Sequence, residues 1–268
     1  MVFSMIYEEQ KIYKDTKKLH EQKVSGIVFG SETCVYKALN EEVISTNVIN
    51  MTNIRYVTPM IPEGYIEKMY RYIKKLVAYG ELKVTFNDYG LLYRCRDLIQ
   101  LKVIIPVLGR VLTRSIIDCP SYSFILQNES ENLKKAIVGT TWNHESKLLL
   151  LKAYGINEIE VNMIYDESFC YLKQNGILLT AHSENILLSV GKSCFASRYM
   201  NKPIPYSCEE KLCDKKIEVE LIKKWKKGFY IDNKDLRDKL YIYGNSVFKK
   251  VQEDSLKNVE DFFDIVII

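Results

Sequence analysis

The sequence predicts an α/β fold in which parallel strands close into a barrel, with a cysteine-bearing C-terminal extension. Apolar runs of strand length alternate with helical patterns over residues 1–190, an order typical of strand–helix–strand units with parallel pairing. Roughly eight such runs occur, and no glycine-rich phosphate loop follows the first of them. Both features favour a barrel over an open doubly wound sheet, which is the alternative architecture.

The predicted helices follow from local patterns. Residues 63–79 carry apolar side chains at spacings of three and four, which form one apolar stripe, and Gly80 stands where a C-cap glycine belongs. Asp88 is suited to cap the helix that follows it, because a short acidic side chain can accept the first free N–H groups. The helices after Gly80 are expected over 89–97, 141–154 and 166–174.

The predicted strands are short apolar runs bounded by glycine, proline or polar residues. Their length, four to seven residues, suits strands that are buried on both faces of a parallel sheet. In chain order they are 24–30, 54–59, 82–86, 103–108, 137–140, 158–163, 177–181 and 186–190.

The chain changes character after Val190. Residues 191–216 are polar, contain cysteines and are broken by two prolines, and residues 215–227 are rich in lysine. Beyond them, 239–244 is strand-like and 246–263 is helix-like. We therefore expect an α/β barrel domain over 1–190, and a cysteine loop and C-terminal extension packed on the barrel over 191–268.

Composition excludes several classes of protein. The 268 residues are 47% hydrophobic, which is enough for a packed core, and the net charge of +4 does not by itself argue for nucleic-acid or membrane binding. No apolar stretch of about 18 residues occurs, so no membrane span is expected. Acidic residues at positions 8 and 9 interrupt the start where a signal peptide needs an apolar segment, so we expect a cytoplasmic protein. The lysine-rich run could contact RNA, with a solvated surface as the alternative.

Four cysteines form the strongest candidate site. Cys34 follows the first predicted strand, and Cys194 follows the strand 186–190; because strand ends of a parallel barrel open on one face, these two residues are expected to meet. Cys208 and Cys213 could fold over them. Four thiolates without a nearby histidine suit zinc or an iron–sulfur cluster, and the absence of a C-x2-C pair favours the cluster. Packing of cysteines as small apolar residues is the alternative.

Four further residues follow strand ends and are candidates for binding substrate: Asp88, Arg110, Arg114 and His182. A guanidinium can bind a carboxylate or phosphate in a bidentate way, and an imidazole can relay protons. The alternatives are surface ion pairs for Asp88, Arg110 and Arg114, and a satisfied core or surface histidine for His182. The sequence contains no H-E-x-x-H or G-x-S-x-G motif that would indicate a hydrolase.

Several segments resemble the collagenase-like peptidase family U, in particular its UbiU-like and UbiV-like iron–sulfur members. The segment ILLSVGKSCFASRY, with two further cysteines behind it, is the most specific part of the resemblance. The other matching segments are GIVFGSETCVYKA, LKVTFNDYGLL, VIIPVLGRVLTRS and LLLLKAYGINEIEV, in the same order along the chain.

The resemblance implies a TIM-like barrel with a 4Fe-4S cluster on Cys34, Cys194, Cys208 and Cys213. It also implies oxygen-independent modification, hydroxylation first, of a quinone precursor, an RNA base or another substrate. The chain would act as an enzyme or as one half of a pair with a homologous partner subunit. The alternatives are a non-catalytic, cluster-binding partner and, last, a peptidase.

Overall fold

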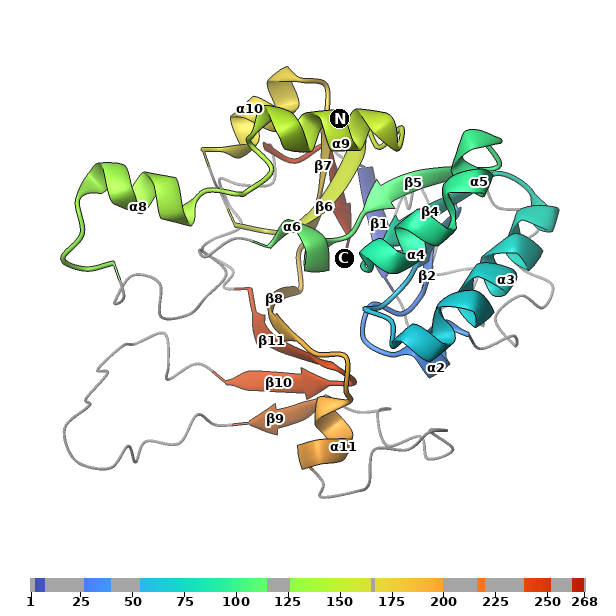
Figure 1. Ribbon diagram of the computed structural model, residues 1–268. Coiled ribbons are helices and arrows are strands. Elements are labelled where there is room, and N and C mark those ends of the chain that lie inside the picture. The colour runs from blue at the N-terminus through green and yellow to red at the C-terminus, as the bar shows by residue number, and fades with distance from the viewer. Residues whose placement is uncertain are drawn as a thin grey trace.

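Two sheets organise the part of the chain that the computed structural model describes (Figure 1). The described residues are 3–7, 27–39, 54–114, 126–164, 167–199, 216–219, 239–251 and 262–267. Cys119, Cys208, Cys213 and most of the lysine-rich run lie outside these ranges.

The larger sheet is curled and consists entirely of parallel pairs. Its described strands pair in the order β1–β12–β7–β6–β5–β4–β3–β2, and β2 pairs in turn with β1. The contact between β5 and β6 is the narrowest, with the single pair Leu108–Ile159. The strands are β1 (Phe3–Tyr7), β2 (Ile27–Gly30), β3 (Ile54–Val57), β4 (Leu82–Phe86), β5 (Ile104–Leu108), β6 (Glu158–Asn162), β7 (Leu178–His182) and β12 (Ile265–Ile267). A mixed α/β fold on a curled parallel sheet, which we call the parallel sheet, is thereby confirmed.

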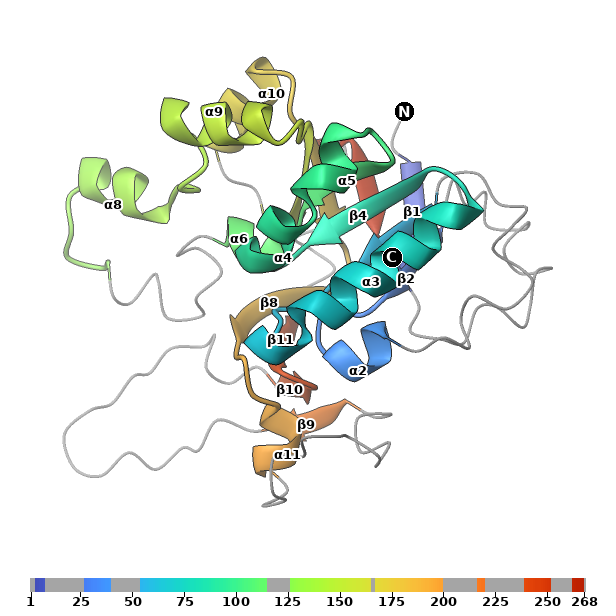
Figure 2. The same ribbon diagram turned by 45° about the vertical axis from the view of Figure 1, so that its right-hand side comes forward.

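Helices cover the outside of the parallel sheet (Figure 2). In both views α3, α4 and α5 lie on the side of β4, and α9 and α10 lie beside β6 and β7. The helices are α2 (Val35–Ala38), α3 (Ile66–Leu76), α4 (Tyr89–Arg94), α5 (Arg96–Gln100), α6 (Arg110–Thr113), α8 (Glu131–Val138), α9 (Glu145–Ala153), α10 (Phe169–Gln174) and α11 (Phe195–Tyr199), with 3-10 turns η3 (Glu63–Tyr65) and η4 (Val77–Tyr79) on either side of α3.

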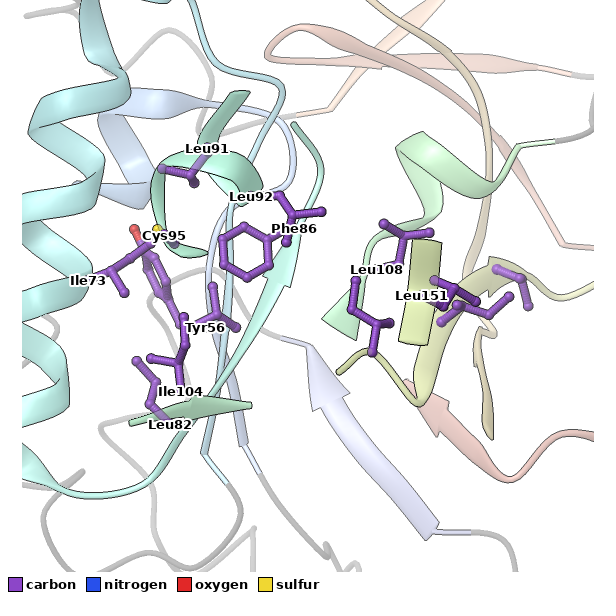
Figure 3. Packing of buried hydrophobic residues seen from close by; sticks show 14 of the residues in the cluster. Tyr56, Ile73, Leu82, Phe86, Leu91, Leu92, Cys95, Ile104, Leu108 and Leu151 are labelled. Carbon is purple, nitrogen blue, oxygen red and sulfur yellow. The ribbon is translucent and has the colours of Figure 1, made fainter. Parts of the chain in front are cut away.

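The apolar core lies between these helices and the parallel sheet. The apolar stripe predicted on helix 63–79 faces this core, where Met69, Ile73 and Leu76 of α3 are buried. Figure 3 shows Cys95 beside Ile73 and Tyr56, between α3 and the sheet. Each such large apolar side chain contributes about 1.5–3 kcal/mol on burial, so this layer fixes the position of the strand ends that carry the polar residues.

The smaller sheet is antiparallel and has the strand order β8–β11–β10–β9. Its strands are β8 (Asn185–Val190), β9 (Ile217–Val219), β10 (Leu240–Tyr243) and β11 (Ser246–Lys250). The hairpin of β10 and β11 is closed by the two residues Gly244 and Asn245, since Tyr243 pairs with Ser246. In both views this antiparallel sheet lies at the end of the parallel sheet where α2 and α6 are found.

The topology corrects the expected pairing of strand 186–190. Strand 186–190 was expected in the barrel, but β8 pairs with β11 of the antiparallel sheet. The parallel sheet is instead completed by β12, which pairs with both β7 and β1. The antiparallel sheet is thus an insertion between two neighbouring strands of the parallel sheet. An apolar run such as 186–190 has the composition of a buried strand in either type of sheet, so composition does not identify its partner.

Two local predictions were also wrong. Residues 137–140 were expected as a strand, but α8 extends through Val138, because the run belongs to a longer segment of good helix formers, Glu131–Val138. Residues 246–250 were expected within a helix and form β11. The two buried side chains of that strand, Ser246 and Phe248, are two residues apart, which is the period of a strand.

None of the helices in the described ranges combines the length and the apolar character needed to cross a bilayer.

Candidate functional site

The hairpin turn Gly244-Asn245 is held between two loops that each carry a cysteine. The N–H of Asn245 donates to the carbonyl oxygen of Thr33 over 2.9 Å. On the other side, the N–H of Gly191 donates to the carbonyl oxygen of Asn245, also over 2.9 Å. We call this arrangement of residues 31–34, 191–197 and 244–245 the cysteine junction. It brings together segments of β2, β8 and the β10–β11 hairpin that are remote in sequence.

Cys34 reaches the junction from the end of β2. Its N–H donates to the Ser31 hydroxyl over 3.1 Å, and the N–H of Thr33 donates to the same oxygen over 3.2 Å. These bonds fold the loop directly behind Gly30, so that Cys34 immediately precedes α2 and its side chain is half-buried. Backbone N–H groups of the loop thus bond to a side chain of the same loop, which fixes the local conformation in which Cys34 is held.

Cys194 reaches the same turn from the end of β8. Its Sγ lies 3.5 Å from the carbonyl oxygen of Gly244 and accepts the N–H of Ser197 over 3.4 Å. The N–H of Ala196 donates to the Gly244 carbonyl over 3.1 Å.

Gly244 permits this close approach. Its φ is +55°, and a Cβ placed on it would lie 2.4 Å from the carbonyl oxygen of Thr33. Only glycine fits a turn that is both left-handed and pressed against backbone. A second contact supports the junction, because Lys37 donates to the hydroxyl of Tyr243 and lies over its ring.

Of the four expected metal ligands, Cys34 and Cys194 are described. Cys194 contacts this turn through its Sγ, whereas Cys34 directly follows Thr33, whose carbonyl oxygen accepts a bond from the turn. Cys194 was expected to follow a strand of the barrel, but it follows β8 of the antiparallel sheet. Within the described ranges, no group of three or more histidine, cysteine, aspartate and glutamate side chains is placed to hold a metal ion. Cys208 and Cys213 lie outside those ranges.

A second polar cluster connects strands β3, β4, β6 and β7. Arg55 donates to Glu160 over 2.9 Å and also pairs with Glu158, which accepts a further bond from Lys83 over 3.0 Å. Each carboxylate is also bonded by a threonine, Thr180 to Glu158 and Thr85 to Glu160, both over 2.6 Å. We call these residues, with His182, the buried charge network.

His182 belongs to this network. Its Nε2 lies 3.0 Å from the Glu160 carboxylate, and only 4% of the residue is exposed. Burial raises the pKa of Glu160, but the hydrogen bond and charge of His182, followed by the charge of Arg55, outweigh it and lower that pKa to about 2. The structure thus gives His182 a carboxylate partner that holds its ring within the sheet.

The other residues expected to bind substrate lie in varied settings. Asp88 caps α4, because its carboxylate accepts the N–H of Leu91 over 3.0 Å and that of Ile61 over 3.3 Å. Arg110 is 3% exposed and forms an ion pair with Glu32. Arg114 follows α6, and its buried Nε has no hydrogen-bond partner.

Sequence reasoning missed the residues that hold these groups. Glu32 was not singled out, although it stands two residues before Cys34, and Asn162 was not recognised at the end of β6. The signal for the buried charge network was present, because Glu158 and Glu160 alternate within an apolar strand and so share one face. A pair of carboxylates on one face of a buried strand predicts cationic partners inside the sheet.

The remaining described cysteines are remote from the junction. Cys95 is fully buried in the core, and burial raises the pKa of its thiol to about 12, so it remains a protonated, apolar side chain. Cys170 lies in α10 and is half-buried.

Comparison of the chain with protein families, with curated proteins and with solved structures finds no match. The function proposed below therefore rests on the family resemblance of the sequence together with the geometry of the described residues.

Replacing Gly244 with alanine tests the close approach in the junction. We expect Gly244→Ala to lower the free energy of unfolding by at least about 1 kcal/mol more than Gly155→Ala, because both glycines have positive φ but only the Cβ at 244 meets backbone. Urea denaturation of the two variants measures the difference. Equal losses would show that the turn is not pressed against Thr33.

Replacing Arg55 with methionine tests the buried charge network. The substitution leaves two buried carboxylates without their shared cation, so we expect the free energy of unfolding to fall by about 3–5 kcal/mol. Arg71→Met is the matched control, because Arg71 pairs with Glu67 at the surface and should be nearly neutral. Similar stabilities of the two variants in denaturant would contradict the network.

The depressed pKa of Glu160 predicts acid lability. A carboxyl group whose pKa falls from 4.5 to about 2 on folding stabilises the protein fully above pH 4.5, and this contribution is lost as the pH falls towards 2. We therefore expect the unfolding free energy of the wild type to decline more steeply over that interval than that of Glu160→Gln. Denaturation curves at several pH values measure both slopes, and parallel slopes would refute the assignment.

Proposed function

We propose that this chain binds a 4Fe-4S cluster at the cysteine junction through Cys34, Cys194, Cys208 and Cys213. The observation that carries the proposal is that one turn contacts both Thr33, the residue before Cys34, and the sulfur atom of Cys194. Two half-buried thiols beside a tight turn, one of them accepting an N–H bond, match the soft and partly shielded ligand set that iron–sulfur clusters require.

The proposal extends to the fold. Each strand of the parallel sheet pairs with its neighbours in chain order, which supports a TIM-like barrel. Its seventh and eighth strands pair with each other, and the antiparallel sheet is inserted between them along the chain. Cys34 then lies in the loop after the second strand, on the side where barrel enzymes carry their sites. The insertion brings Cys194 to the same side.

The reaction we propose is an oxygen-independent modification, with hydroxylation of a quinone precursor, an RNA base or another substrate as the first candidate. A cluster held by four cysteines supplies electron transfer, since none of its irons has an open position. The chain's own part is to hold two thiols at a fixed separation and to shield them by half-burying their side chains.

A non-catalytic partner subunit is the second candidate, and one observation favours it. Asp88, Arg110 and His182, which were expected to bind substrate, each contact groups of the protein itself. In this alternative, the cluster would shape a surface on which an active homologue docks.

Anaerobic purification tests the proposal. We expect a brown protein with iron and acid-labile sulfide, and we expect Cys34→Ala and Cys194→Ala to lose both, because each removes one sulfur ligand. Cys170→Ala is the matched control, since that half-buried cysteine lies in α10 and should leave the iron content unchanged. Full iron content in Cys194→Ala would overturn the ligand assignment. Substrate turnover that requires a co-expressed homologue would favour the partner role.

A further inference from the structure

Arg110 occupies a buried position between the two stems of the cysteine junction. It is the first residue of α6, directly after β5, and only 3% of it is exposed. Its Nε and Nη2 both donate to the carboxylate of Glu32, the former over 2.9 Å. Its Nη1 donates to the carbonyl oxygen of Asn185 over 2.6 Å and to Oδ1 of Asn162 over 3.2 Å.

Two of these partners, Glu32 and Asn185, belong to the segments that lead to Cys34 and Cys194. Glu32 lies in the loop of Cys34, two residues before it, whereas Asn185 begins β8, the strand that ends just before the loop of Cys194. A single guanidinium therefore contacts the side chain of Glu32 in the Cys34 loop and the backbone of Asn185 at the start of β8, the strand that leads to Cys194.

Asn162 strengthens the second connection. Its Oδ1 accepts the N–H of Leu187 over 2.8 Å, and its Nδ2 donates to the carbonyl oxygen of Leu187 over 3.1 Å. The side chain of Asn162 thus pairs with β8 as a neighbouring strand would. Because Arg110 also donates to Asn162, β8 is held against the end of β6 by the same cluster.

The geometry requires arginine. The planar fork of a guanidinium can donate two bonds to one carboxylate and still direct a third nitrogen elsewhere, which an ammonium group cannot do in a fixed direction. All three nitrogens of Arg110 have partners in the protein, so the side chain is suited to holding segments together rather than to binding an anionic substrate.

We infer that Arg110 is a positioning residue for the metal site and sets the separation between Cys34 and Cys194. The inference rests on the proposed function and adds to it a residue that acts through the Cys34 loop and through β8 without touching the cluster. Glu32 is the ion-pair partner of Arg110, and we call this pair of residues the Arg110–Glu32 clamp.

The test compares Arg110→Lys and Glu32→Gln with the wild type after anaerobic reconstitution with iron and sulfide. Outer partners of metal ligands change metal retention about 10- to 100-fold when they are replaced. We expect iron release to a chelator to accelerate by about 10-fold or more in both variants. We also expect the reduced cluster to change its electron paramagnetic resonance spectrum and its reduction potential, because the sulfur positions shift.

Arg55→Lys is the matched control. Arg55 is as deeply buried and pairs with two carboxylates, but its partners lie on β6, away from both cysteine loops. Loss of stability alone would affect this variant too, whereas its spectrum and potential should match those of the wild type.

The outcomes separate the two proposals. A wild type that retains no cluster refutes the proposed function and the clamp with it. A wild type that holds a cluster, together with clamp variants whose spectrum, potential and iron release equal those of Arg55→Lys, refutes the clamp alone. If Arg110→Lys does not fold, Glu32→Gln carries the same comparison, because it keeps the shape of the side chain.

Discussion

The contact on which the rest of the site depends is the backbone bond from Asn245 to Thr33. It joins the tip of the antiparallel hairpin to the loop that follows β2, and the second face of the same turn receives the loop of Cys194. Because Gly244 has no side chain, the backbone of the turn packs directly against the backbone of the Cys34 loop. Two cysteine-bearing loops from remote parts of the chain thus contact one turn.

The fold also contains two groups of buried charges. The Arg110–Glu32 clamp connects the Cys34 loop with the end of β6 and the start of β8, and the buried charge network lies among β3, β4, β6 and β7. Within the network, burial lowers the pKa of Arg55, but the nearby charges of Glu158 and Glu160 outweigh it and raise that pKa, so the guanidinium stays charged inside the sheet. A buried ion pair adds little net stability but costs much when one partner is removed. Such residues specify one arrangement of the strands.

Sequence alone predicted the elements with strong local signals. The stripe of α3 and the capping of α4 by Asp88 depend on residues a few positions apart, so they were found nearly to the residue. Partners across the fold could not be found in this way: β8 has the apolar composition of a barrel strand and pairs instead with β11. The loops that carry Cys34 and Cys194 both contact the Gly244-Asn245 turn, but Cys194 follows a strand of the antiparallel sheet and not, as had been expected, a barrel strand. The clamp was missed because Glu32 and Arg110 are joined only by the tertiary fold.

The most direct test of the central claim is a crystal structure of anaerobically prepared protein with anomalous scattering measured at the iron edge. The account predicts one strong iron peak beside the Gly244-Asn245 turn, within bonding distance of the sulfur atoms of Cys34 and Cys194. An iron-free turn in protein that was reconstituted with iron and sulfide, or a peak bound by neither cysteine, would contradict it.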